Sequence, residues 1–297
     1  IEEGIPPGFL GGIPTKQIVS DQNILKLGIH QYSSGFNFNR NEASIRLGVY
    51  NSKFQDLKTK LNPDLLSFLP TPSKYSGAVS IDMDRFANFF NHSYLPMLQK
   101  QDTPTTATDR ARISSFADKL KESGSNWKDF FDNFDGDFAW AITNETFLSD
   151  SLANIDWKGV VAIGCRSEDQ ARWLTRFVQE KILTDSLKQA GAETIRRGKR
   201  IFIASSEYRM AIENGNSLGS ENDVHLVALR KNPVSIHFKD IFPKEVALWK
   251  HFNQVDIQGK FQAGRQVWEA RLGMKGDLEH SLFAFMNLFR ALNPQKE

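Results

Sequence analysis

The densest group of carboxylates lies in residues 132–137, with the sequence Asp-Asn-Phe-Asp-Gly-Asp. Acids and a glycine at this spacing are typical of a calcium-binding loop, in which the glycine stands sixth and a bidentate Glu stands twelfth. If Gly136 is sixth, the first position is Phe131 and the twelfth is Ile142. Neither side chain can bind calcium, so we interpret the segment as a turn of solvent-exposed carboxylates that precedes a strand.

The same carboxylates could instead perform glycoside hydrolysis, which needs two acids on opposite sides of the scissile bond. The candidate acids are Asp132, Asp135 and Asp137. Nothing in the sequence places a second acid across from them. A polysaccharide hydrolase is therefore an alternative to a protein without catalysis, and we assign no catalytic residue.

The histidines and the single cysteine form no local site. The six histidines are scattered, without the spacing by which two of them could bind zinc from one helix or strand: His30, His92, His225, His237, His251 and His280. Cys165 follows an apolar run, so we interpret it as a small core residue, and as the only cysteine it can form no disulfide within the chain. No nucleophile elbow, Walker loop or dinucleotide fingerprint is present. We therefore expect no metal ligand and no cofactor.

The overall charge gives little support for a polyanionic partner. Lys and Arg total 37 against 35 Asp and Glu, a net charge of +2. The one basic run, 196–200, is best explained as a hairpin turn before a strand that starts at Ile201, and we expect no nucleic-acid partner. No apolar run approaches the length of a membrane-spanning helix.

The elements that would position these residues are organised around Lys158–Leu183. Its apolar run 160–163 predicts a buried strand that ends at Gly164. Ser167 and Gln170 then have the spacing of a capping box, in which each side chain bonds the other residue's backbone N–H. Apolar residues at helical spacing follow, so a strand leads directly into an amphipathic helix.

Similar strand-to-helix units are predicted along the rest of the chain. Alternating hydrophobicity predicts hairpins over 25–32 with 43–49 and over 255–262 with 266–272, each leading into a helix. Shorter units run from 78–81 past Asp82, and from 201–204 past Ser206 to a helix end at Asn214. We expect an α+β fold of antiparallel β-hairpins feeding amphipathic helices, with the repeated units packed into one or two mixed sheets.

The chain length of 297 residues fits two closely packed subdomains. We expect a linker or ordered N-terminal loop over 1–16, an α+β subdomain over 17–150 and a second over 151–297, with the seam near Ser149–Asp156. Gln101–Thr108 is predicted to be a polar loop or a disordered insertion. Because the sequence begins with Ile1, we expect a processed or truncated product.

The order of these segments resembles a family of uncharacterised secreted lipoproteins common in Bacteroides-type bacteria. The resemblance is carried by 66–70 leading to 77–82, by 134–138, by 159–164 with its helix, and by 268–292. It implies a cell-envelope location, periplasmic or surface-exposed, with a lipid anchor on a cysteine upstream of this sequence. It implies no activity and no role for any residue.

We therefore expect an envelope protein with a binding or structural role, whose partner is an unknown protein or glycan. Contact with the membrane would be made only through the possible N-terminal lipid anchor. A third alternative is a carrier in which helices rich in phenylalanine, of which the chain has 23, line a cavity for an apolar ligand.

Overall fold

The computed structural model describes residues 29–38, 42–51, 62–100, 104–144, 158–183, 185–219, 234–239, 252–262 and 265–274. The chain forms two compact units, one of residues 1–55 with 238–297 and one of residues 56–237. This division differs from the expected boundary at residue 150, because strands near the C-terminus pair with a strand near the N-terminus. The predicted linker over 1–16 and the predicted seam over 149–156 lie outside the described residues.

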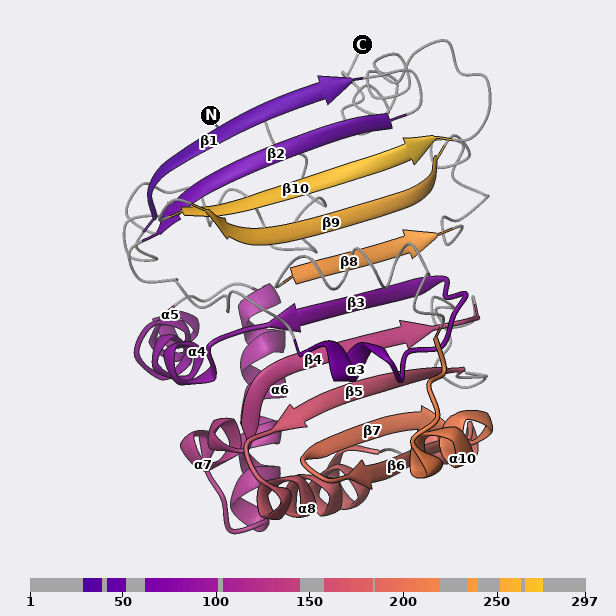
Figure 1. Ribbon diagram of the computed structural model, residues 1–297. Helices are drawn as coiled ribbons and strands as arrows, with labels where there is room; N and C mark the ends of the chain where they lie inside the picture. The colour runs from indigo at the N-terminus through magenta and orange to yellow at the C-terminus, as the bar shows by residue number, and fades with distance from the viewer. Residues whose placement is uncertain are drawn as a thin grey trace. The chain divides into compact units, whose positions relative to one another are not determined.

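The first unit contains an antiparallel sheet of two long hairpins (Figure 1). Its strands follow the order β1-β2-β10-β9 and comprise β1 (Ile29–Phe38), β2 (Glu42–Asn51), β9 (Phe252–Gln262) and β10 (Arg265–Met274). The hairpin of β9 and β10 confirms the prediction from alternating residues. In β10, Trp268 lies between Leu47 of β2 and Gly259 of β9.

The second unit contains a sheet with the order β8-β3-β4-β5-β7-β6. The pairings of β3 with β4, β4 with β5, β5 with β7 and β7 with β6 are all antiparallel. The strands are β3 (Tyr75–Ser80), β4 (Phe134–Ile142), β5 (Gly159–Cys165), β6 (Ala192–Arg197), β7 (Arg200–Ser205) and β8 (Val234–Lys239), of which β8 belongs to this unit as far as His237. The α+β class is confirmed. The expected mixture of parallel and antiparallel neighbours is not found among these four pairings. The chain passes from β5 to β6 at the sheet edge, and β7 then returns between them, so that β7 is antiparallel to both.

Helices cover both faces of this sheet. They are α3 (Pro63–Leu66), α4 (Met83–Phe89), the π-helical turn η1 (Phe90–Tyr94), α5 (Leu95–Lys100), α6 (Pro104–Glu122), α7 (Trp127–Asp132), α8 (Glu168–Phe177), the π-helical turn η4 (Val178–Ile182), α9 (Asp185–Gln189) and α10 (Ser206–Asn214). None of the described helices is long and apolar enough to cross a membrane.

The central strand-to-helix unit, β5 followed by α8, is confirmed, but its capping box is only half formed. The Ser167 hydroxyl accepts a hydrogen bond from the Gln170 backbone N–H at 3.2 Å, as a helix N-cap should. The Gln170 side chain returns to Ser167 only through its Oε1, which accepts from the Ser167 hydroxyl at 3.0 Å and not from the backbone N–H that a capping box uses. Its Nε2 donates instead to the backbone carbonyl of Asp132 at 2.8 Å, which ties α8 to the end of α7.

One predicted segment differs from the structure and two others cannot be compared with it. The predicted polar loop 101–108 is helical from Pro104 onward. The helices predicted to follow the two hairpins, after residues 49 and 272, lie outside the described residues.

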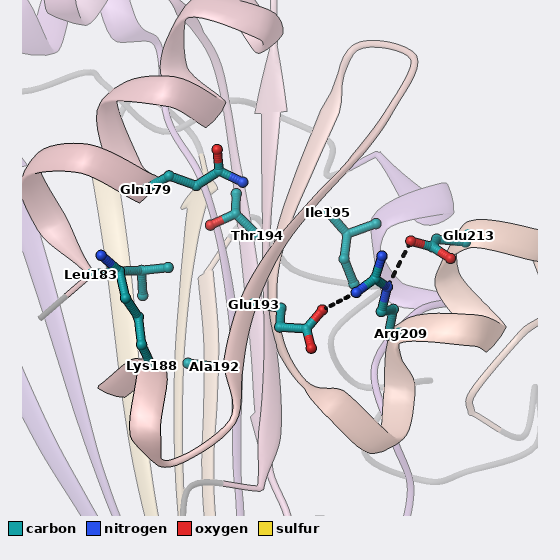
Figure 2. A pocket seen from close by; sticks show the side chains of 9 residues that line it. All are labelled: Gln179, Leu183, Lys188, Ala192, Glu193, Thr194, Ile195, Arg209 and Glu213. Carbon is teal, nitrogen blue, oxygen red and sulfur yellow. Dashed lines mark hydrogen bonds and ion pairs between the residues drawn. The ribbon is translucent and has the colours of Figure 1, made fainter. Parts of the chain in front are cut away.

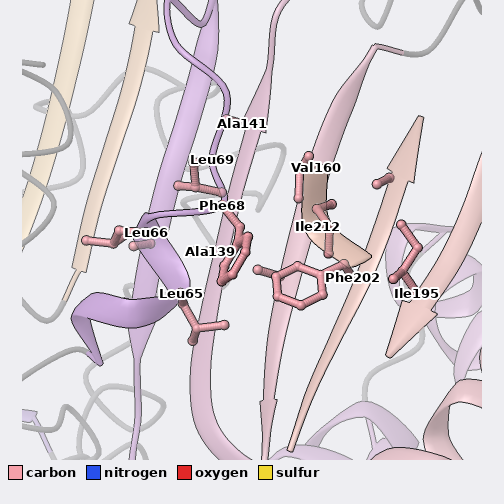
Figure 3. Close-up of a cluster of buried hydrophobic side chains, with 13 residues drawn as sticks. Leu65, Leu66, Phe68, Leu69, Ala139, Ala141, Val160, Ile195, Phe202 and Ile212 are labelled. Carbon is pink, nitrogen blue, oxygen red and sulfur yellow. The ribbon is translucent and has the colours of Figure 1, made fainter. Parts of the chain in front are cut away.

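One sheet face packs against α3 and α10 (Figure 3). Small residues such as Ala139 and Ala162 line the strands here, and larger residues fill the space above them. Phe68, which follows α3, meets Phe202 of β7 edge to face with ring centroids 5.0 Å apart. This core fixes β7, and therefore also its hairpin partner β6.

The other sheet face carries an aromatic core beneath α4, α7 and α8. Phe90 and Trp127 have ring centroids 4.8 Å apart, and Phe130 and Phe134 lie edge to face at 4.9 Å. Aromatic side chains thus fill the space between these helices and the sheet. These rings contact one another directly, whereas a carrier would have to hold them apart around a ligand.

Candidate interaction site

The acids of the predicted cluster do not form a shared site, and two of them accept hydrogen bonds that stabilise β4 and its neighbours. Asp137 is only 6% exposed and accepts hydrogen bonds from the Asn62 backbone N–H at 3.2 Å and from the Ser80 hydroxyl. Asp135 accepts a bond from the Asp137 backbone N–H at 2.9 Å. The prediction of a solvent-exposed turn is therefore wrong for Asp137, because β4 pairs with β3 in a register that sets Asp137 opposite Ser80. Asp132, the third acid, ends α7.

Cys165 is buried at the end of β5, as predicted. Burial and the nearby Asp135 carboxylate raise the pKa of its thiol to about 12. Such a thiol remains protonated and unreactive near neutral pH. Among the described residues, no three His, Cys, Asp or Glu side chains lie close enough to hold a metal ion.

The basic run forms the predicted hairpin between β6 and β7. Gly198 occupies the turn with a φ of 55°, a left-handed conformation that favours glycine. Arg197 lies over the Phe68 ring, 5.6 Å from its centroid, and Arg200 pairs with Asp64 at 2.5 Å. These two cations bind the hairpin to the segment around α3.

The hairpin leaves one side of β6 open. Among the described strands β6 pairs only with β7, and Figure 1 shows it at the margin of its sheet. The hydrogen bond from the Ser206 N–H to the Gly191 carbonyl, at 3.0 Å, shows which residues of β6 form hydrogen-bonded pairs with β7. Because an antiparallel ladder alternates, Glu193, Ile195 and Arg197 bond to β7. The backbone N–H and C=O groups of Ala192, Thr194 and Arg196 therefore point away from the sheet.

A groove of about 280 Å³ follows this open edge, and Figure 2 shows the side chains around it. Its floor is β6 from Ala192 to Ile195. One wall is formed by Gln179 of η4, by Leu183 directly after η4 and by Lys188 of α9. The other wall is formed by Arg209 and Glu213 of α10. The walls come from helices that flank β6 on its two sides, so the groove surrounds the strand edge.

An ion-pair triad holds the α10 wall. The Arg209 guanidinium donates to the Glu193 carboxylate at 2.7 Å and to the Glu213 carboxylate at 2.9 Å (Figure 2). The hydrogen bond that Arg209 donates to Glu213 and the negative charge of Glu193 raise the pKa of Arg209 above its already high ordinary value. Exposed ion pairs contribute little stability, so we interpret the triad as a device that orients side chains along the groove.

Thr194 supplies a further polar group at the floor of the groove. Its Oγ1 atom is buried and has no hydrogen-bond partner among the described residues. A buried hydroxyl without a partner costs about 1–3 kcal/mol. The outward-facing backbone groups and this hydroxyl therefore place several unsatisfied polar atoms along one short strand.

No family model, no curated protein and no solved structure matches this chain.

Nothing in the sequence indicated the groove, although the basic run indicated the hairpin that carries it. The β-branched pair Thr194-Ile195 directly before the basic run was a usable signal for a strand. The walls could not be found in this way, because η4, α9 and α10 come to β6 only in the folded unit.

Proposed function

We propose that the chain is a non-catalytic binding module that takes up a strand of a partner polypeptide along the open edge of β6. The observation that carries this proposal is the groove around that edge, with the outward-facing backbone of Thr194 at its floor. The backbone of a partner strand carries N–H and C=O groups that match the outward-facing groups of β6, in keeping with the expected binding role.

An extended polypeptide fits the chemistry of this edge better than an apolar small molecule does. An added strand donates to and accepts from the outward groups of Ala192, Thr194 and Arg196 in the same spacing that β7 uses on the other side. An apolar ligand would bury these groups without partners. The volume of about 280 Å³ holds one or two guest side chains, which suits a single strand.

The charges along β6 favour one orientation of the guest. Glu193 lies near the start of the strand, and Arg196 and Arg197 lie at its end. A guest that runs antiparallel would therefore carry an acid first and a base four residues later. Opposite charges directly across an antiparallel pair contribute about 0.2–1 kcal/mol.

The test is the binding of a fluorescein-labelled peptide, Ser-Glu-Thr-Val-Thr-Lys-Ser, measured by fluorescence anisotropy. We expect Thr194→Pro to weaken binding by roughly tenfold or more, because proline removes an outward N–H that the β6–β7 ladder does not use. Arg196→Pro is a second variant of the same kind. The matched control is Thr194→Ser, which keeps both the backbone N–H and the hydroxyl and should bind like the wild type.

A peptide with the two charges exchanged, Ser-Lys-Thr-Val-Thr-Glu-Ser, tests the orientation and should bind more weakly. Equal binding of the first peptide to the wild type and to both folded proline variants would contradict the proposal. Circular dichroism of each variant establishes that the fold is retained.

Two broader expectations remain proposals. The cell-envelope location rests on the resemblance in segment order alone, and mass spectrometry for an acylated N-terminal cysteine in the full-length protein would test it. The repetition of hairpin and helix units along the whole chain is supported in the second unit, where β3 leads to α4, β5 to α8 and β7 to α10.

A further inference from the structure

We infer that the strand taken up by this edge is β6 of a second copy, in an antiparallel pair whose twofold axis passes through Ile195. This inference rests on the proposed strand-binding function and names its partner. In this register Glu193 of each copy faces Arg197 of the other copy.

The side chains of β6 are complementary to themselves when the strand is reversed. Glu193, Ile195 and Arg197 project on one face, with an acid, an apolar residue and a base at successive positions. An antiparallel copy presents the same series in the opposite order. Each acid therefore meets a base, and like charges are not opposed on this face.

The backbone selects the same register. The outward-facing residues are Ala192, Thr194 and Arg196, and an added strand must place its own outward-facing residues opposite them. With the axis at Ile195, Thr194 of each copy forms a hydrogen-bonded pair with Arg196 of the other. If the axis passed through Thr194, Glu193 would face Ile195 and lose its charged partner. If it passed through Arg196, the two Arg196 residues would face each other, and their like charges would repel.

The positions of Glu193 and Arg197 in the ladder also favour contact between their side chains. They fall in non-hydrogen-bonded pairs with the second copy, where opposed Cα atoms are about 4.5 Å apart and side chains are closest. Glu193 already accepts a bond from Arg209 and has acceptor capacity for a second donor. Arg209 keeps its bond to Glu213 if Glu193 turns toward the second copy. Arg197 lies over Phe68 and donates from one guanidinium nitrogen to the Ile212 carbonyl at 3.4 Å, and its other N–H groups can donate to Glu193 of the second copy.

The exposed surface of α10 gives independent support. Met210 is the large apolar side chain with notable exposure among the described residues, at 64%. Its neighbour Arg209 lines the groove. A twofold axis perpendicular to the sheet keeps both α10 helices on one face, where they approach each other across the joined edges. Met210 would then lose contact with water at the boundary between the copies.

The test is analytical ultracentrifugation of the full chain and of two charge-reversal variants, Glu193→Arg and Arg197→Glu. The first variant has bases at both positions and the second has acids at both positions. We expect each variant alone to self-associate roughly ten- to a hundredfold more weakly than the wild type. We expect an equimolar mixture to recover dimers, because each base of one variant then faces an acid of the other.

The double variant E193R/R197E restores complementarity within one chain and should dimerise like the wild type. A wild-type chain that stays monomeric at concentrations up to about 1 mM would overturn the inference. So would dimers that neither reversal weakens, because their interface would lie elsewhere. In either case the peptide assay still decides whether the edge accepts a strand, so the two proposals can fail separately.

Discussion

Trp140 of β4 lies directly opposite Gly77 of β3, and its indole ring fills the space that a Cβ atom on Gly77 would occupy. The first unit repeats this relationship between Trp268 of β10 and Gly259 of β9, where an added Cβ would lie 2.7 Å from the ring. In both pairs the aromatic ring covers a strand glycine that has no side chain to pack.

Gly77→Ala should therefore destabilise the protein by about 1–3 kcal/mol, because the new methyl group forces the Trp140 ring out of its site. Urea unfolding monitored by circular dichroism measures this loss. Gly35→Ala is the control, since no atom lies within 4 Å of an added Cβ there, and its effect should be small. Adding Trp140→Leu to Gly77→Ala should cost less than the sum of the two single changes. Additive losses would show that the ring and the methyl group do not compete for space.

Asp137→Ala should destabilise the second unit by about 1–3 kcal/mol, because the Asn62 N–H and the Ser80 hydroxyl lose their shared acceptor. Asp132→Ala at the end of α7 is the control and should change the free energy of unfolding by less than about 0.5 kcal/mol. The measurement is the urea midpoint of each variant. A neutral Asp137→Ala, combined with loss of a polysaccharide hydrolysis seen in the wild type, would favour the hydrolase alternative instead.

Cys165 should make stability depend on pH above about 9. The ordinary thiol pKa of 9.0 rises to about 12 in the folded protein, mainly through burial. Between these values the unfolded chain releases the proton and the folded chain retains it, so rising pH favours unfolding. The stabilising contribution is fully present below pH 9 and is lost as pH approaches 12. We expect the free energy of unfolding to fall more steeply between about pH 9 and about pH 12 in the wild type than in Cys165→Ala.

A thiol reagent provides a second measurement of the same residue. Cys165 should react with such a reagent at neutral pH only after the chain opens around β5, since the thiol is buried and protonated. Urea should therefore accelerate labelling in parallel with unfolding. Rapid labelling of the folded protein would contradict the structural role assigned to this cysteine.

Ser167→Ala should destabilise α8 by about 1 kcal/mol, because the hydroxyl caps the Gln170 N–H. Gln170→Ala should also be destabilising, for a different reason, since its amide bonds the carbonyl of Asp132 at the end of α7. The Ser167 hydroxyl also donates to Gln170 Oε1 at 3.0 Å, so we expect the two effects to be coupled in a double-mutant cycle. Additive effects would contradict this contact between the two side chains.

The sequence by itself determined the elements whose signals are local. The apolar run before Gly164, the N-cap at Ser167 and the basic turn after β6 each depend on residues within a few positions of one another, so β5, α8 and the β6–β7 hairpin were predictable. The α+β class followed from the same patterns. The burial of Cys165 followed from its place directly after a buried strand.

Only the tertiary structure decided which elements became neighbours. Pairing of β10 with β2 joins residues more than two hundred positions apart, and hydrophobic alternation carries no information about the partner strand. Pairing of β3 with β4 buried Asp137, which the local sequence had indicated as solvent-exposed. The groove along β6 depends on η4, α9 and α10, whose side chains meet there because hydrophobic burial on both faces of the sheet fixes the helices around its edge.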